Sequence, residues 1–165
     1  MGIKRISKHL VASRWRVRQV FTTDVLAKIE AAIKVSESSH AGQVRFAVEG
    51  ALDGTALFSN QSPRSRALDV FAHLRVWDTE HNNGVLIYLL LADRDVEIVA
   101  DRGFNGKVNA AQWEKICRAM EVEFRGRNFE SGVLDGIKAV TQLLAAHFPP
   151  SGPHKNELPD KPVVL

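Results

Sequence analysis

Apolar positions in the first half of the chain change between helical and strand spacing. One helical stripe follows an N-cap signal at Thr22 or Thr23 and ends at residues 36–39; it comprises Val25, Leu26, Ile29, Ala32 and Ile33. Residues 43–49 then alternate polar and apolar, which is typical of a half-buried strand. After a loop-like segment at residues 50–61, Ser62-Pro63 predicts a second helix that ends near Leu74.

The run at residues 85–91 is continuously apolar, which predicts a strand that is covered on both faces. Strand, helix and strand form a βαβ unit, so we expect the two strands to be parallel. The turn Asp93-Arg94-Asp95 leads into a less buried strand at residues 96–100. If Asp93-Arg94 is a two-residue hairpin loop, Leu86 faces Asp101 and Gly103 lies opposite Gly84.

Two further amphipathic helices follow this hairpin. The first begins after the capping residue Asn109 and ends at Gly126. The second runs from about Phe129 to His147 and is stopped by Pro149. The succession of strands and helices predicts an α/β fold with helices layered on a small mixed sheet, which contains the βαβ unit and a central hairpin.

Length and composition favour one folded domain with a short extension at each end. The chain has 165 residues, of which 45% are hydrophobic and 25% are charged, as in ordinary globular proteins. We expect a basic arm at residues 1–21, a domain at 22–150 and a proline-containing tail at 151–165. The apolar end of the tail, residues 163–165, is expected to dock onto a sheet edge or a neighbouring subunit. The single cysteine, Cys117, falls on a helical stripe and is expected to be buried.

Positive charge is concentrated at the N-terminus. Residues 1–20 contain no acidic residue and six basic ones: Lys4, Arg5, Lys8, Arg14, Arg16 and Arg18. Three interpretations remain open for this arm: docking on the domain or on a protein partner, contact with an anionic membrane surface, and nucleic-acid binding. Nucleic acid is the least favoured, because basic and aromatic residues do not interleave through the domain. Without a secretory signal or a membrane-spanning segment, the expected location is cytoplasmic, including the membrane periphery.

Polar clusters flank the hairpin, and its antiparallel strands bring both clusters to one end of the sheet. Asp78, Glu80 and Asp101 supply carboxylates, which suit Ca²⁺ or Mg²⁺. The remaining candidates for ligand binding are Asn82, Asn83, Arg102 and Gly103. The competing interpretation is that these are turn-forming residues that bond their own backbone.

The turn Asp93-Arg94-Asp95 is a second candidate site at the opposite end of the hairpin, near Asp53. Open α/β sheets usually bind ligands at the carboxyl ends of their strands, although a charged turn is more often simply solvated. The chain has no P-loop, no dinucleotide-binding glycine motif and no Gly-x-Ser-x-Gly elbow. We therefore expect no nucleotide cofactor.

Taken together, the hairpin motifs resemble the TPM domain family. They are Asn82-Asn83-Gly84-Val85-Leu86, then Ala92-Asp93-Arg94-x-Val96-x-Ile98, then Gly103-Phe104, followed by two helices. The resemblance covers about Ile29 to Phe148. It implies an α/β/α sandwich, and family members include a thylakoid-lumen acid phosphatase, calcium-binding modules and accessory factors of membrane complexes.

The functional expectation is a binding or interaction module for a divalent cation or a small anion. The alternative is a metal-assisted acid phosphatase in which Asp78 and Asp101 hold the ion and Arg102 steadies phosphate. In that alternative, His81 or Glu80 transfers protons. The segment Trp77 to His81 departs from the family pattern, and Asp101-Arg102-Gly103 replaces a Gly-aromatic-Gly loop.

Overall fold

A computed structural model describes residues 14–52, 61–150 and 155–165, and the loop residue Asp53 lies outside these ranges. The elements in chain order are α2 (Arg14–Val20), α3 (Thr23–Ser36), η1 (Glu37–Ser39), β1 (Gln43–Glu49), α5 (Pro63–His73), β2 (Gly84–Leu90), β3 (Asp95–Ala100), η2 (Arg102–Phe104), α6 (Ala110–Arg125), α7 (Phe129–His147) and β4 (Val163–Val164). The predicted caps are confirmed: side chains of Thr22, Ser62 and Asn109 accept bonds from the first turns of α3, α5 and α6. In the described part of the chain, no helix is long and apolar enough to cross a bilayer.

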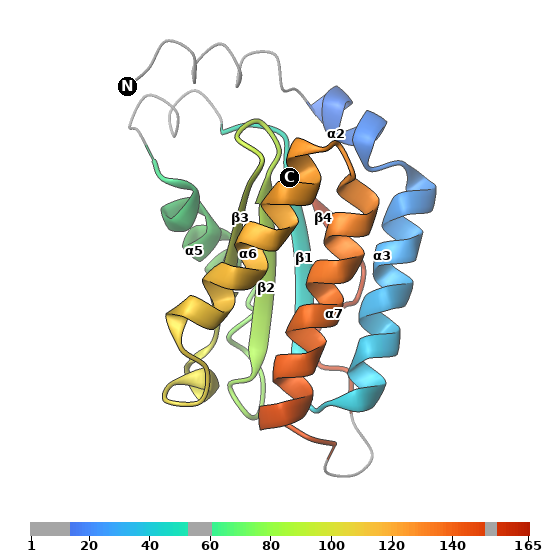
Figure 1. Cartoon of the computed structure of the whole chain (residues 1–165). Helices are drawn as coiled ribbons and strands as arrows, with labels where there is room; N and C mark the ends of the chain where they lie inside the picture. The colour runs from blue at the N-terminus through green and yellow to red at the C-terminus, as the bar shows by residue number, and fades with distance from the viewer. Residues whose placement is uncertain (1–13, 53–60, 151–154) are drawn as a thin grey trace.

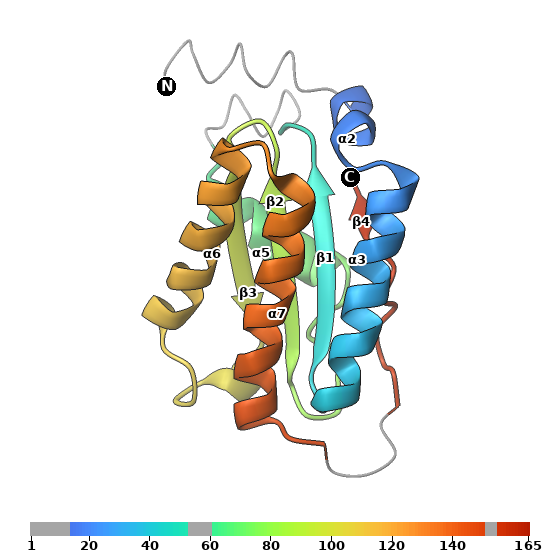
Figure 2. The ribbon, with the colours of Figure 1, turned by 45° about the vertical axis from the view of Figure 1, so that its right-hand side comes forward.

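Helices cover both faces of a four-stranded sheet with the order β3-β2-β1-β4. α2, α3, α6 and α7 lie on one face, whereas α5 lies on the other (Figures 1 and 2). β1 pairs in parallel with β2 and β4, and β2 pairs antiparallel with β3. The α/β/α sandwich, the mixed sheet and the parallel βαβ unit are therefore confirmed.

The register of the β2–β3 hairpin differs from the prediction by two residues. Leu86 pairs with Val99 rather than with Asp101, because the turn contains four residues, 91–94, instead of two. The amides of Leu91 and Ala92 donate to carbonyl oxygens of Glu49 and Gly50, at 2.9 and 3.0 Å. These bonds hold Leu91 and Ala92 against the end of β1, so β2 leaves the hairpin ladder after Leu90, and Asp95 pairs with Leu90 instead of Ala92.

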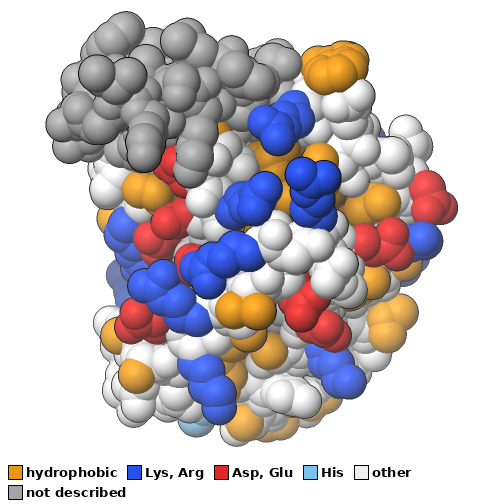
Figure 3. Space-filling view, turned by 45° about the horizontal axis from the view of Figure 1, so that its top comes forward, with side chains coloured by type: hydrophobic (Ala, Val, Ile, Leu, Met, Phe, Trp, Pro, Cys, Tyr) orange, Lys and Arg blue, Asp and Glu red, His pale blue; other side chains and the backbone are white. Residues whose placement is uncertain are grey.

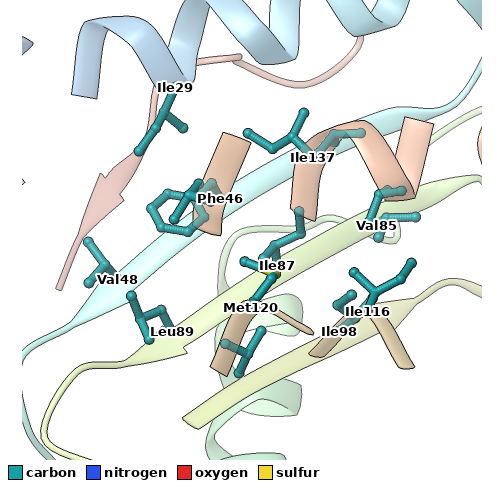
Figure 4. Packing of buried hydrophobic residues seen from close by; sticks show 14 of the residues in the cluster. Ile29, Phe46, Val48, Val85, Ile87, Leu89, Ile98, Ile116, Met120 and Ile137 are labelled. Carbon is teal, nitrogen blue, oxygen red and sulfur yellow. The ribbon is translucent and has the colours of Figure 1, made fainter. Parts of the chain in front are cut away.

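Two apolar clusters, one on each face of the sheet, form the core. In the larger cluster, Phe46, Ile87 and Ile98 of the sheet meet Ile29, Met120 and Ile137 of the helices (Figure 4). The smaller cluster lies beneath α5 and also contains Leu158 from the C-terminal segment. Val17 and Phe21 belong to the larger cluster, so α2 and the residue that follows it are fixed to the domain. Cys117 is buried as expected, and burial raises the pKa of its thiol.

β1 is buried on both faces, although its alternating pattern predicted one exposed face. The second face carries Gln43, Arg45 and Glu49, and each has specific hydrogen-bond partners, although the buried Nε atom of Arg45 has none in the described structure. Glu49 accepts two bonds from Arg66, at 2.9 and 3.0 Å, and one from the Tyr88 hydroxyl at 2.6 Å. The polar half of the pattern therefore marks buried hydrogen-bonded groups rather than solvent contact.

The C-terminal segment covers part of this polar face. The Gln43 side-chain oxygen accepts from the amides of Glu157 and Leu158, at 2.7 and 2.9 Å. Arg45 donates to the carbonyl oxygens of Pro159 and Lys161. β4 then extends the sheet beside β1, so docking on a sheet edge, one of the two predicted places for residues 163–165, is confirmed.

Candidate functional site

An open hollow of about 710 Å³ lies at the end of the sheet where β1 and β2 finish. Its wall is formed by α2, the β2–β3 turn, the last turns of α6 and the start of α7. Five arginines line it: Arg16, Arg94, Arg118, Arg125 and Arg127. This is the end of the sheet at which α/β proteins usually bind ligands, and it includes the predicted second site at Asp93-Arg94-Asp95.

Arg127 reaches the hollow from an unusual helix end. Its amide donates to Phe124 at 3.1 Å, and the next amide, of Asn128, donates to Glu123 at 3.0 Å. In this bonding pattern the residue after the C-cap adopts a left-handed conformation, which glycine occupies most often. Here Gly126 keeps a φ of −75°, and Arg127 takes the left-handed position with a φ of 67°. Such backbone strain in a residue other than glycine often marks a functional position.

Arg94 is the second arginine with a left-handed backbone in this hollow. Its φ is 53°, and its amide donates to the Leu91 carbonyl oxygen at 3.2 Å, which closes the β2–β3 turn. Because the start of the same turn is bonded to the end of β1, the backbone beneath Arg94 is held on both sides. The hollow therefore has Arg94 on the wall formed by the sheet and Arg127 on the wall formed by the helices.

A buried carboxylate holds two of the remaining arginines. Glu121 on α6 is only 5% exposed and contacts Arg118 at 3.0 Å and Arg125 at 3.3 Å. These pairs compensate the buried charge and orient both guanidinium groups on the wall. In the described part of the chain, by contrast, no carboxylate lies within salt-bridge distance of Arg16, Arg94 or Arg127.

Asp95 lies at the start of β3, where it lines the hollow and a smaller neighbouring groove of about 360 Å³. Burial, followed by the nearby carboxyls of Glu97, Glu121 and Asp93, raises the pKa of Asp95 to about 6, and Arg118 opposes this shift. Its Oδ1 atom is buried and accepts no hydrogen bond in the described structure. Asp95 therefore adds negative charge to the hollow only above about pH 6.

The end of the molecule that carries α2 and the hollow is rich in positive charge. Figure 3 views this end and shows Lys and Arg side chains gathered across its surface, with fewer acidic side chains between them. The three arginines without carboxylate partners come from α2, the hairpin turn and the α6–α7 connection. This arrangement suits an anion, because a planar guanidinium can form two parallel hydrogen bonds to phosphate or carboxylate.

The carboxylates predicted to bind a metal lie toward the opposite end of the sheet. Asp78 is exposed and forms a 2.8 Å ion pair with Arg75, while Glu80 is exposed and its amide donates to Glu157. Asp101 caps η2 by accepting from the Arg102 amide, and its Oδ2 atom is buried without a partner. Among the described residues, no three Asp, Glu, His or Cys side chains are placed to hold one ion.

The residues predicted to bind a ligand at that end contact one another. Arg102 donates to the Asn82 side chain at 2.8 Å, and the Gly103 amide donates to the Asn82 carbonyl oxygen at 2.9 Å. Asn83 is fully buried and donates from its side chain to Ala41 at 2.9 Å. The structure thus brings the two polar clusters together, as the hairpin predicted, and bonds them largely to each other and to the backbone.

Sequence reasoning placed a candidate site at the hairpin turn but missed the arginines around it. Arg125 and Arg127 flank Gly126, which had suggested only the end of a helix. The sequence places Arg16 in a basic arm and does not fix where this arm docks. The sequence does show several arginines on and just after α6, namely Arg118, Arg125 and Arg127. However, no pattern of neighbouring residues indicates that they lie close to Arg94 in the fold.

The chain matches a family model and several solved structures. The TPM domain model matches residues 17–143. The BA42 protein of the psychrophilic bacterium Bizionia argentinensis is similar at 30% identity, with a TM-score of 0.74, over 87% of this chain and 94% of that chain. The N-terminal domain of a protein from P. gingivalis shares the fold at 22% identity and a TM-score of 0.60, over 77% of this chain and 78% of that chain.

A third structure of the same fold is the N-terminal domain of the cg2496 protein from Corynebacterium glutamicum. It is 13% identical, with a TM-score of 0.55, over 74% of this chain and 73% of that chain. A search of curated proteins finds no match. The family model covers well over half of the sequence, and the structural match to BA42 extends over nearly the whole chain. This chain therefore belongs to the TPM domain family.

Proposed function

We propose that this TPM domain is a binding module for a phosphate-bearing anion, which it holds in the arginine-lined hollow. The observation that carries the proposal is the set of three arginines, Arg16, Arg94 and Arg127, which have no carboxylate partner in the described structure. Uncompensated guanidinium groups converging on one concave surface attract anions. Arg118 and Arg125, held by Glu121, extend the same positive wall.

The hollow suits a ligand larger than a single ion. At about 710 Å³ it is within the range of small-molecule sites, and Val20, Leu91 and Phe129 add apolar surface beside the arginines. A ligand with a phosphate group and an apolar part would use both kinds of wall. Ionised Asp95 repels an anion in the hollow, and its protonation below about pH 6 removes that repulsion.

The direct test is a titration of the full chain with pyrophosphate, in which binding is monitored by changes in the NMR chemical shifts of the backbone amides. Arg127→Asn removes the charge and keeps a residue that tolerates the left-handed backbone. We expect Arg127→Asn and Arg94→Asn each to weaken pyrophosphate binding about tenfold, because a charge-assisted hydrogen bond contributes roughly 1.5 kcal/mol or more.

Arg75→Asn is the matched control for Arg127→Asn. Arg75 has a φ of 53° after α5, with the same bonding pattern that surrounds Arg127, but it pairs with Asp78 away from the hollow. This variant should leave pyrophosphate affinity unchanged. Equal losses in both variants, or shifts confined to residues 78–83 and 101–103, would contradict an anion site in the hollow.

The same protein serves to test the cation and phosphatase alternatives. A saturable thermal shift with Ca²⁺ or Mg²⁺ that disappears in Asp101→Asn would support a cation site near the buried Oδ2 atom of Asp101. Turnover of p-nitrophenyl phosphate that falls in Arg127→Asn would support a hydrolase that uses the hollow. The binding-module proposal expects pyrophosphate binding without turnover.

A further inference from the structure

The end of the molecule around the hollow also presents an exposed tryptophan. Trp15 lies on α2 and is 67% exposed, immediately before Arg16, which lines the hollow. Arg18, also on α2, is exposed as well. An indole ring so accessible beside several arginines combines the two residue types that proteins place at the headgroup level of membranes.

The orientation of α2 is set by its inward face. Val17 is fully buried, and Phe21, just after the helix, packs against Phe46 and Phe129 with ring centroids 5.9 and 6.1 Å apart. With this face committed to the core, Trp15 and Arg16 remain on the outside of a fixed helix. Their exposure is therefore a consequence of the packing.

The aromatic and basic groups lie at one end of the fold. α2, the β2–β3 turn and the α6–α7 connection all lie at the end of the sheet where β1 and β2 finish (Figures 1 and 2). Arg16, Arg94 and Arg127 come from these three segments.

We propose that this end of the domain docks on an anionic phospholipid surface, with Trp15 among the headgroups and the three arginines on lipid phosphates. The inference rests on the proposed function, because it names phospholipid as the source of the phosphate. A soluble anion in the hollow would leave the indole in water, whereas a membrane surface would cover Trp15 and the arginines together. Each arginine close to an anionic membrane surface strengthens the electrostatic attraction by a similar amount.

The test is sedimentation of the full chain with vesicles of phosphatidylcholine alone and vesicles containing phosphatidylglycerol. We expect partition only into the anionic vesicles, weaker at high salt, with a blue shift of tryptophan emission. Trp15→Ala should lower the partition coefficient about tenfold and abolish most of the blue shift. Arg127→Asn should lower partition about fivefold.

Trp77→Ala is the matched control, because Trp77 is also exposed, at 47%, and lies near Arg75, but in the connection between α5 and the start of β2. It should not change partition. Absence of partition, or equal losses in Trp15→Ala and Trp77→Ala, would overturn membrane docking. So would equally tight binding to single-stranded DNA that does not depend on Trp15.

Pyrophosphate binding separates the two proposals. If Trp15→Ala loses vesicle binding and keeps pyrophosphate affinity, both the membrane surface and the anion site are supported. If pyrophosphate binds in the hollow but no vesicle does, membrane docking fails and the anion site stands. If vesicles bind through Trp15 while pyrophosphate does not bind and Arg127→Asn has no effect, the anion site fails, and membrane docking as proposed, with arginines on lipid phosphates, fails with it.

Discussion

The two ends of the sheet contain similar polar residues but use them differently. At the end near Asp101, side chains bond one another or the backbone, as in the Arg75–Asp78 and Arg102–Asn82 pairs. At the other end, Arg16 and Arg127 line a hollow without a carboxylate partner in the described part of the chain. Polar residues that already have partners stabilise turns, whereas convergent charges without partners are available to a ligand.

Arg75 and Arg127 make this difference clearest. Each follows a helix, has a left-handed backbone and donates its amide three residues back. Arg75 forms an ion pair with Asp78 and lies 5.8 Å from the centre of the Trp77 ring, whereas Arg127 faces the hollow. The same local structure thus serves a surface contact at one end and a candidate binding site at the other.

The largest expected effect is on stability at the end near Asp101, from Gly103→Ala. A Cβ atom at Gly103 would overlap the carbonyl oxygens of Asn82 and His81, and both belong to backbone that cannot move freely. We expect a loss of about 2–4 kcal/mol in the free energy of unfolding, measured by denaturant titration. Pyrophosphate affinity of the remaining folded protein should be unchanged; a selective loss of binding would make Gly103 part of the ligand site.

Glu37→Gln tests a carboxyl that acts on stability alone. Burial raises the pKa of Glu37 to about 7, with Asp160 raising it further and the bond from the Val44 amide opposing the shift. Ionisation is therefore disfavoured in the fold, and stability declines as the pH rises from about 4.5 through 7. Above pH 7 the variant should be more stable than the wild type by about 1.5 kcal/mol, with solvent screening taken into account.

Melting curves at pH 5 and pH 8 would show a small part of this gain at pH 5 and the full gain at pH 8. Glu80→Gln, which changes an exposed carboxylate, is the control and should behave like the wild type at both values. A gain of equal size at pH 5 would show that the charge of Glu37 is not its cause.

Asp95→Asn tests the corresponding carboxyl at the hollow. The pKa of Asp95 is raised from 3.8 to about 6, chiefly by burial, so its ionisation reduces stability as the pH rises through this interval. At pH 7.5 the variant should gain about 1 kcal/mol, after discounting for partial exposure, and should bind pyrophosphate more tightly. Because a phosphate ligand also loses a proton near pH 6, the test is the ratio of the two affinities: Asp95→Asn should gain over the wild type as the pH rises through 6, and a constant ratio would assign the pH dependence to another group.

The smallest expected effect is that of Arg102→Gln. Arg102 is exposed, and it donates a hydrogen bond of 2.8 Å to the Asn82 side chain. Because this hydrogen bond is open to solvent, its removal should lower the free energy of unfolding by no more than about 0.5 kcal/mol. Pyrophosphate titration should be the same as for the wild type. A tenfold weakening would move the anion site to the end that the sequence favoured.

Helices and strands with regular apolar spacing were predictable. The stripes of α6 and α7, the continuous run of β2 and the cap at Asn109 are local patterns, and each appears in the structure where expected. β1 was recognised as a strand but not as a buried one. Its polar residues are buried because Arg66, Tyr88 and the C-terminal segment supply partners that lie far away in the sequence.

The candidate sites were predictable only in part. The hairpin correctly brought the polar clusters of residues 78–83 and 101–103 together, despite the register error of two residues. The sequence did not predict that the side chains of Asn82, Asn83 and Arg102 form hydrogen bonds within the fold. Whether two side chains form a hydrogen bond depends on their positions to within a few ångströms. The pattern of apolar residues along the chain does not determine positions so precisely.

The sequence by itself determined the order of helices and strands, the parallel βαβ unit and the apolar faces, because periodicity and capping act over a few neighbouring residues. Only the tertiary structure decided which arginines have no carboxylate partner among the described residues. Arg16, Arg94 and Arg127 meet because α2 docks through Val17 and Phe21, the β2–β3 turn is held by β1, and α6 ends beside both. Their convergence depends on long-range packing, and for that reason no short segment of the chain reveals it.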